Sequence, residues 1–228
     1  MLSILKSWQY QNQYAETIES ILEWIAARNE TVAVNIQKSC LSKSSFWFYD
    51  EQQGTIHNQN NSFFQITGLE KELEDGSVIR QPVILQQEIG FLGILCQEIH
   101  GVMHFLMQAK IEPGNVNKIQ ISPTIQATKS NFTQRHGGAK PPYLEYFQRA
   151  SQYEIVVDQI QSEQSSRFYK KRNRNIIIRV EEEIPVLPSH KWMTLGQIKR
   201  LMRMDNLVNM DTRTVLSCIP YCKLDACQ

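Results

Sequence analysis

The stretch PVILQQEIGFLGILCQEIHGVMHFLMQAKIEPGN, residues 82–115, decides the fold class of this chain. It holds three or four apolar segments of strand length, which polar residues separate. It closes on EPGN (112–115), a turn pattern with proline at its second position and glycine at its third. The next segment, KIQISPTIQAT (118–128), resumes an extended pattern. These segments predict consecutive β-strands over 82–128.

The N-terminal side adds a helix and further strands. Residues 14–28, YAETIESILEWIAAR, carry apolar side chains at helical spacing and predict an amphipathic helix. Residues 31–49 predict extended structure. TVAVNI (31–36) has the alternating pattern of a strand, and FWFY (46–49) is typical of an aromatic strand. DEQQG (50–54) predicts a turn, and TIHNQNNSFFQITGL after it predicts a hairpin.

The C-terminal side mixes helices with a strand. YLEYFQRA (143–150) and VVDQIQSEQSSRFYKKRN (156–173) predict helices, and IIIRVEEEIPV (176–186) predicts a strand. TLGQIKRLMRM (194–204) predicts a final helix with Thr194 as its N-cap. Many strands with helices at both ends and in the middle predict an α+β fold.

Length and composition predict a single globular domain. The 228 residues suit one domain over 1–228, with a core over about 31–190 and a helical tail over about 192–228. Apolar residues make up 42% and charged residues 21% of the chain, which excludes a disordered, collagen-like or coiled-coil protein.

The sequence also predicts a cytoplasmic location. The longest nearly pure apolar run, 89–96, is far shorter than the ~20 residues of a membrane helix. The start, MLSILKSWQYQNQ, turns polar too soon for a signal peptide. Five cysteines without zinc-type CxxC pairs predict reduced thiols. We find no HExxH or Cys/His spacing for a metal, and no GxGxxG or GxxxxGK[ST].

The net charge of +1 hides a basic third of the chain. Residues 129–179 contain ten Lys and Arg against four Asp and Glu, a net charge of +6, so the rest of the chain carries −5. The segment RFYKKRNRN (167–175) concentrates this charge, and its cations could bind phosphate groups. A solvated helix face and a nucleic-acid patch are the alternatives.

Two polar segments precede that basic run. SPTIQATKSNF (122–132) combines hydroxyl and amide groups with a lysine, which suits a diphosphate or a sugar. RHGG (135–138) contains two glycines that let a backbone approach a ligand closely, although a plain loop explains them equally. His57 and His136 are candidate acid–base groups, or ordinary surface histidines.

Several segments occur here in one order, and that order carries a resemblance. They are QPVILQQEIGFLGIL, HFLMQAKIEPGN, QISPTIQATKSN, HGG followed by PYLEYF, QSEQSSRFYKKRNRN and WMTLGQIKRLMRMDNLVNMDTRTVLSC. The series resembles the NDP-hexose 2,3-dehydratases of deoxysugar biosynthesis, and the likeness covers residues 45–218. The stretch from Trp47 through IHNQNNSFFQI (56–66) is similar to an earlier part of the family's pattern.

The resemblance implies a fold and an assembly. Family members are usually about twice this length, with two related halves in tandem, and this chain corresponds to one half. The halves have a fold like that of Nudix hydrolases, so the resemblance implies a Nudix-like mixed sheet with flanking helices. This sequence lacks the Nudix box, so Mg²⁺-dependent pyrophosphate hydrolysis is not implied. A homodimer that replaces the tandem is expected.

The resemblance also implies a reaction. The substrate would be an NDP-4-keto-6-deoxyhexose, most often linked to thymidine diphosphate (dTDP), and the reaction removes water across C2 and C3. The C4 ketone acidifies the C3 proton, so the enzyme must supply a base, donors for the enolate oxygen and an acid for the leaving hydroxyl. The chemistry is redox-neutral and implies no cofactor. A 3-ketoreductase or an aminotransferase is expected to act on the product.

Chemical inference assigns three residues to catalysis. Lys110 and Glu112 lie two apart on a predicted strand and therefore share a face, so Glu112 could take the C3 proton while Lys110 contacts the enolate oxygen. A structural ion pair beside the turn is the alternative. Tyr143 is a candidate acid, or a core aromatic residue.

Further residues are expected to bind the substrate. Trp47 is a candidate platform for the base or the sugar, or else a core residue, and Trp192 is expected to line the site. The remaining candidates supply hydroxyl, amide, aromatic or cationic groups and are Thr128, Lys129, Ser130, Asn131, Phe132, Arg135, Ser166, Arg172 and Arg174.

Two other functions remain open from the sequence. A relative of these dehydratases could bind a sugar nucleotide without catalysis, and turnover by the pure chain would separate this from an enzyme. A nucleic-acid binder using RFYKKRNRN would show a steep salt dependence of binding. We expect the enzyme, with no nucleic acid and no membrane among its partners.

Overall fold

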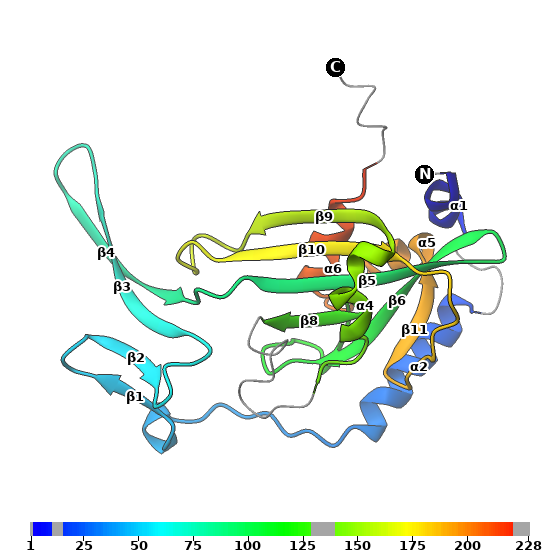
Figure 1. The fold of residues 1–228 in the computed structure, drawn as a ribbon. Helices are drawn as coiled ribbons and strands as arrows, with labels where there is room; N and C mark the ends of the chain where they lie inside the picture. The colour runs from blue at the N-terminus through cyan, green and yellow to red at the C-terminus, as the bar shows by residue number, and fades with distance from the viewer. Residues whose placement is uncertain (1, 11–15, 129–139, 221–228) are drawn as a thin grey trace. The chain divides into compact units, whose positions relative to one another are not determined.

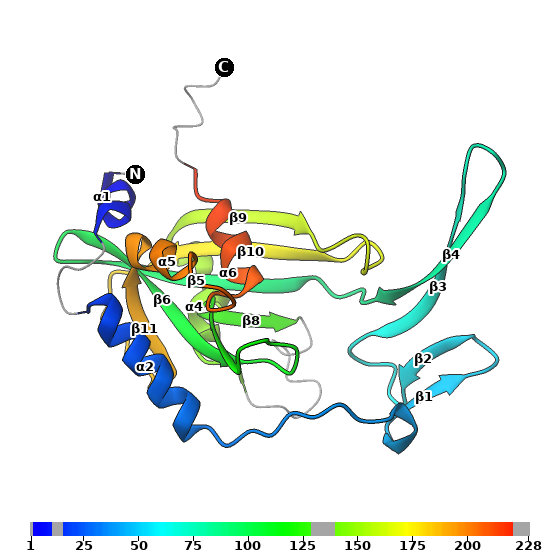
Figure 2. The same ribbon diagram turned by 180° about the vertical axis from the view of Figure 1, so that it is seen from behind.

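The computed structural model describes residues 2–10, 16–128 and 140–220, which form two compact units. The larger unit comprises 1–34, 90–159 and 174–228, and the smaller unit comprises 35–89 and 160–173. Figures 1 and 2 show the chain from opposite sides. Both strands and helices are present, which confirms the predicted α+β class. The single domain over 1–228 stays a prediction.

The described part of the larger unit is built on a seven-stranded sheet. Five strands run side by side in the order β11 (His190–Thr194), β6 (Val102–Ile111), β5 (Gly90–Ile99), β10 (Arg172–Arg179) and β9 (Glu154–Ser162). The other two are β7 (Ile119–Ser122), which pairs with β6, and β8 (Ile125–Thr128), which pairs with β5. The strands predicted over 82–128 are therefore confirmed.

The sheet opens into a fork between β5 and β6. These strands pair only near their hairpin turn, from Cys96 opposite Phe105 to Ile99 opposite Val102. Further along, β5 pairs with β8 and β6 pairs with β7. The Thr124 hydroxyl lies at the branch point, where it accepts a hydrogen bond from the Leu95 N–H at 2.9 Å and donates one to the Leu106 carbonyl. This bridge holds the two arms of the fork in place.

Helices cover both faces of this sheet (Figures 1 and 2). One face carries α1 (Leu2–Gln9), α2 (Ile18–Thr31), α5 (Leu195–Leu201) and α6 (Met210–Ser217), and the other carries α4 (Leu144–Gln148), which η2 (Ala150–Gln152) follows. The neighbours Ile94 and Leu95 belong to the two different cores. Strands covered on both faces need apolar residues without alternation, which explains the run FLGILC.

The capping prediction for the last part of the chain is confirmed. Thr194 is the N-cap of α5, where its hydroxyl accepts a hydrogen bond from the Gln197 N–H at 3.1 Å. The Gln197 side chain accepts one from the Thr194 N–H at 2.9 Å, which completes a capping box. The helix that begins after Thr194 is not the final one, because α6 follows it, and the helical tail over 192–228 stays a prediction.

The smaller unit, over its described residues 35–89 and 160–173, contains an antiparallel four-stranded sheet. Its strands follow chain order, after the short helix η1 (Leu41–Lys43), as β1 (Trp47–Asp50), β2 (Thr55–Asn58), β3 (Gln65–Glu72) and β4 (Val78–Leu85). The predicted turn at 50–54 and the strand pairing after it are confirmed, because β1 pairs with β2 and β2 with β3.

Three expectations about elements are wrong. TVAVNI (31–36) forms no strand, because Thr31 ends α2 and the described residues 32–36 pair with no neighbouring strand. Residues 156–173 are not helical: β9 and β10 flank a turn, because the β-branched run IVV pairs across the sheet. The strand predicted over 176–186 ends at Arg179, where three exposed glutamates follow.

Candidate active site

Lys110 and Glu112 lie together at the open end of β6. Ala109 and Ile111 pack into the core, so Lys110 between them points to the opposite face of the strand. The Lys110 ammonium lies 3.1 Å from a Glu112 carboxylate oxygen, and both side chains are partly exposed. The EPGN turn is confirmed by the hydrogen bond from the Asn115 N–H to the Glu112 carbonyl at 3.1 Å. The predicted shared face therefore exists.

Three further polar side chains surround this pair. Lys110 Nζ donates to Gln126 Oε1 at 2.9 Å, and Gln126 Nε2 donates to Asp211 Oδ2. Asn209 Nδ2 also donates to Gln126 Oε1, at 3.4 Å. We call Lys110, Glu112, Gln126, Asn209 and Asp211 the Lys110 cluster. It brings together groups from β6, β8 and the start of α6.

Backbone hydrogen bonds hold the start of α6 against β7. The Ile121 N–H donates to the Leu207 carbonyl at 2.8 Å, and the Asn209 N–H donates to the Ile121 carbonyl at 3.0 Å. Asn209 is the N-cap of α6, and its Oδ1 accepts from the Thr212 N–H at 2.8 Å. These contacts fix the positions of Asn209 and Asp211 beside Gln126, although both lie 83 or more residues after it in the chain.

The sequence did not single out Gln126, Asn209 or Asp211. All three lie within segments that carry the family resemblance, QISPTIQATKSN and DNLVNMDTRT. Their residue types are common in polar loops, so composition alone could not select them. What marks them is convergence on Lys110, which only the fold shows.

Tyr143 lies in the core on the α4 side of the sheet. Its hydroxyl donates to the Pro185 carbonyl at 2.9 Å and accepts from the Leu187 N–H at 2.9 Å. Burial raises the pKa of this phenol, and the hydrogen bond from Leu187 acts in the opposite direction. Tyr143 takes part in none of the Lys110 cluster contacts given above, and its role as an acid stays a prediction.

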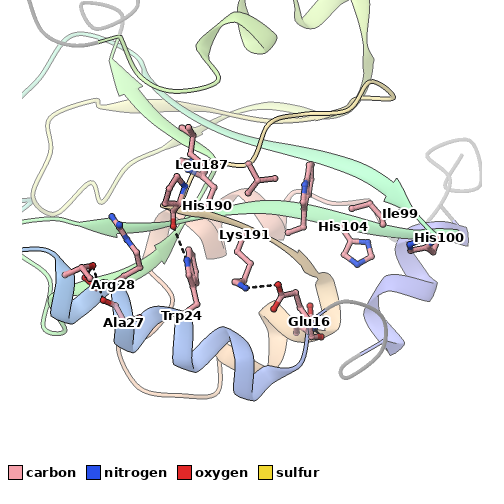
Figure 3. A pocket seen from close by; sticks show the side chains of 15 residues that line it. Glu16, Trp24, Ala27, Arg28, Ile99, His100, His104, Leu187, His190 and Lys191 are labelled. Carbon is pink, nitrogen blue, oxygen red and sulfur yellow. Dashed lines mark hydrogen bonds and ion pairs between the residues drawn. The ribbon is translucent and has the colours of Figure 1, made fainter.

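Trp192 borders a cavity of about 710 Å³ along the edge strand β11. Trp24, His104, His190 and Lys191 also line this cavity (Figure 3). The Trp24 indole N–H donates to the Pro188 carbonyl at 3.0 Å and so ties α2 to the segment before β11. The volume is typical of small-molecule sites, and Trp192 is the candidate residue that faces it.

His190 connects the cavity wall with the fork of the sheet. Its Nε2 lies 3.1 Å from the Thr124 carbonyl oxygen, and its Nδ1 lies 3.0 Å from the Ser189 hydroxyl. Burial lowers the pKa of His190 to about 4, with the Thr124 hydrogen bond acting in the opposite direction. The imidazole is therefore neutral at pH 7.

The candidate phosphate ligands divide into several groups. Thr128 ends β8, two residues after Gln126. Arg174 forms two hydrogen bonds with Asp158, at 2.7 and 2.6 Å, and this guanidinium holds the pKa of the carboxyl below its usual range. Arg172 is exposed on the smaller unit and lines a hollow of about 590 Å³. Outside the described residues lie Lys129, Ser130, Asn131, Phe132, Arg135 and His136.

The smaller unit holds the other candidates. Trp47 is half-buried, and its ring lies 4.8 Å from that of Phe64, beside a hollow of about 350 Å³. Ser166 is exposed, and its carbonyl accepts a hydrogen bond from the Gln81 side chain at 3.4 Å. His57 is buried, with Nδ1 3.0 Å from the Thr55 hydroxyl.

The basic run 167–175 is part turn and part β10, so the helix-face alternative for it is wrong. Among residues 2–10, 16–128 and 140–220, no group of three or more His, Cys, Asp or Glu side chains is arranged to hold a metal ion. In the same part of the chain, no helix combines the length and the apolar character that crossing a membrane requires.

The chain is thus of the α+β class, and its larger unit carries a lysine–carboxylate cluster at the open fork of the sheet. The chain belongs to the NDP-hexose 2,3-dehydratase family, whose model matches residues 18–219. It is 49% identical over 200 residues to a dTDP-4-dehydro-6-deoxy-α-D-glucopyranose 2,3-dehydratase of Saccharopolyspora spinosa, covering 87% of this chain and 41% of that protein. It is 41% identical over 210 residues to one of Amycolatopsis orientalis, covering 89% and 45%.

The chain spans less than half the length of these curated relatives. Among solved structures, it is similar to an ADP compounds hydrolase, with a TM-score of 0.44 and 9% identity over 82% of this chain and 95% of that one. A Nudix hydrolase from M. smegmatis gives a TM-score of 0.37 and 11% identity, over 67% and 97%. Both TM-scores are below 0.5, so the Nudix-like arrangement of the sheet stays a prediction.

Proposed function

We propose that this chain is a sugar-nucleotide lyase that removes water across C2 and C3 of a dTDP-4-keto-6-deoxyhexose in deoxysugar biosynthesis. The observation that carries the proposal is the Lys110–Glu112 couple, 3.1 Å apart, in a chain of the NDP-hexose 2,3-dehydratase family. The relatives named above are 2,3-dehydratases of this substrate class, which supports the same reaction here.

The first step is removal of the C3 proton. The C4 ketone makes this proton acidic, because the electron pair of the C3–H bond can move into a C3–C4 enolate. Glu112 takes the proton, and a positioned base of this kind contributes roughly 10²–10⁴-fold to the rate. Lys110 donates to the enolate oxygen at C4, and one such donor contributes about 10²–10³-fold.

The second step expels the C2 hydroxyl. The enolate electrons form the C2–C3 double bond, the C2–O bond breaks, and the hydroxyl leaves as water after it gains a proton. Tyr143 is the proposed acid. The product is the enol of a 3,4-diketo sugar, so no oxidant or reductant is consumed and no cofactor is needed in this proposal.

The nucleotide supplies most of the binding energy, remote from the reacting carbons. Its proposed ligands are the predicted set: Trp47, Thr128, Lys129, Ser130, Asn131, Phe132, Arg135, Ser166, Arg172, Arg174 and Trp192. Thr128 supports this part of the proposal, since it follows Gln126 of the Lys110 cluster by two residues. Calorimetry with dTDP in the presence of a chelator tests it, and binding that appears only with Mg²⁺ contradicts metal independence.

The assembly and the cellular context belong to the same proposal. We propose a homodimer, in which two copies of this chain pair. Sedimentation at micromolar concentration tests it, and a lone species near 26.5 kDa contradicts it. We further propose a cytoplasmic location and a 3-ketoreductase or aminotransferase as the next enzyme.

The direct test is incubation of the pure chain with dTDP-4-keto-6-deoxyglucose, followed by mass spectrometry. The expected result is loss of one water from the sugar. dTDP-glucose is the matched control, because it lacks the C4 ketone and its C3 proton is not acidic. Substrate that binds and stays intact contradicts the lyase and supports a binding module.

A further inference from the structure

The amide of Gln126 lies between a cation and a carboxylate. Its Oε1 accepts from the Lys110 ammonium at 2.9 Å, and its Nε2 donates to an Asp211 oxygen. Gln126 is partly buried on β8, and Asp211 lies in the first turn of α6. The two ends of one planar amide therefore join two segments that are 85 residues apart.

The two neighbours together allow only one orientation of this amide. An ammonium is only a donor, and an ionised carboxylate is only an acceptor. If the amide rotated by half a turn, its NH₂ would face Lys110 and its oxygen would face Asp211, so both contacts would become repulsive. The orientation with oxygen toward Lys110 is therefore fixed by Lys110 and Asp211 together, and Asp211 holds the NH₂ end.

Hydrogen bonds between the start of α6 and β7 fix the position of Asp211. The start of α6 is bound to β7 by backbone hydrogen bonds through Ile121, and the Thr212 hydroxyl also donates to the Ile121 carbonyl at 3.1 Å. Asn209 supports the same orientation of Gln126, because its Oδ1 is engaged with the Thr212 N–H and its NH₂ faces Gln126 Oε1.

Fixing Gln126 also fixes Lys110. Within the described residues, the ammonium has two acceptors, Gln126 Oε1 and Glu112 Oε1. An ammonium carries three N–H donors, so one remains for a ligand oxygen. The direction of that third N–H depends on where the other two point.

We propose that Asp211 is a positioning residue, which holds the Gln126 amide so that its oxygen directs the Lys110 ammonium between Glu112 and the substrate. This inference rests on the proposed function, because it assigns to Lys110 and Glu112 the roles given there. Asp211 acts through Gln126 and does not touch the substrate.

Two variants of Asp211 separate positioning from mere folding. Asp211→Ala removes the acceptor of the Gln126 NH₂ and leaves the amide held at its oxygen end only, and it should lower kcat by roughly 10–100-fold while KM stays within about threefold, because the Lys110 ammonium is then held less firmly in its direction. Asp211→Asn keeps an acceptor oxygen for Gln126 and should stay within about threefold of wild type. Asp205→Ala is the matched control: it removes the same side chain from an exposed position six residues earlier and should change neither constant.

A second readout does not depend on turnover. Proton exchange of the Gln126 side-chain NH₂ with solvent, followed by NMR, should be slowed in wild type and in Asp211→Asn, and faster by about tenfold in Asp211→Ala. Equal kcat for Asp211→Ala and Asp205→Ala, or an unprotected Gln126 amide in wild type, overturns the inference. A wild-type chain that protects the amide but dehydrates no substrate overturns the proposed function and leaves the role of Asp211 in orienting the amide supported.

Discussion

The two units of this molecule differ in what they bury. The larger unit has an apolar core on each face of its sheet, with Phe105 and Leu106 fully buried in the two different cores. Among the described residues of the smaller unit, Val83 is the one apolar side chain that is buried, together with polar ones such as Asn58. Large apolar side chains such as Tyr49 are exposed there.

This difference indicates where exact geometry can be held. The Lys110 cluster stands on strands that are packed from both faces, and its polar groups are cross-linked by hydrogen bonds. The candidates of the smaller unit, Trp47, Ser166 and Arg172, are half-buried or exposed. We therefore expect chemistry to depend on the larger unit, while the smaller unit contributes binding at most.

The largest difference is expected in core truncation. Phe105→Ala should lower the free energy of unfolding by about 3–5 kcal/mol, because the ring is fully buried between the sheet and its helices. Val83→Ala in the smaller unit removes two carbons and should cost about 1–2 kcal/mol. Urea unfolding measures both values. Equal losses would contradict the contrast between the units.

Acid should weaken the larger unit through His190. Its pKa is about 4 in the folded chain and about 6.5 when exposed, so between these pH values the unfolded state binds more protons. The free energy of unfolding should therefore fall as pH drops from 6.5 toward 4, by up to about 3 kcal/mol. Burial also lowers the pKa of His104, which acts in the same direction.

The measurement for His190 is the difference in unfolding free energy between pH 7 and pH 4.5. His190→Gln should make this difference smaller than in wild type, whatever it does to stability at pH 7. A variant whose stability depends on pH as strongly as that of wild type would show that His190 is not the group responsible.

Loss of a helix cap should have a moderate effect. Thr194→Ala removes the capping hydroxyl of α5 and should cost about 1 kcal/mol in unfolding free energy. Thr194→Ser retains a hydroxyl and should recover most of that loss. Thermal unfolding compares the two variants, and an unchanged midpoint for Thr194→Ala would show that the cap contributes nothing.

The smallest effect is expected at an exposed ion pair of the smaller unit. Arg80 Nε lies 2.8 Å from a Glu70 oxygen across β3 and β4, with 73% and 58% of the two side chains exposed. Solvent screens such pairs, so Arg80→Ala should change the unfolding free energy by no more than about 0.5 kcal/mol. A loss above about 1 kcal/mol in urea unfolding would contradict the expectation that solvent screens this pair.

The sequence predicted the parts of the fold that local patterns determine. The pattern over 82–128 predicted β5 to β8 and the end of β4, and Thr194 predicted the start of α5. The helix predicted over 156–173 was wrong, because β9 and β10 pair there as neighbouring strands. TVAVNI (31–36) has the alternating pattern of a strand but forms none, because a strand also needs a neighbouring strand to pair with.

The candidate site was predictable only in part, because some of its residues meet only through tertiary packing. Lys110 and Glu112 are close in the chain, so strand periodicity was enough to pair them. Asp211 reaches the cluster through the docking of α6 on β7, which no local pattern encodes. The family motifs contained Gln126 and Asp211 but could not say which of their polar residues meet.

The central claim is that Glu112 takes the C3 proton, and solvent deuterium exchange at C3 of dTDP-4-keto-6-deoxyglucose tests it most directly. Glu112→Gln keeps the shape of the side chain and removes its basicity. We predict that the variant binds dTDP within about threefold of wild type, while C3 exchange and dehydration both slow by at least ~10²-fold. A Glu112→Gln variant that exchanges C3 and dehydrates the substrate at nearly the wild-type rate would contradict the account.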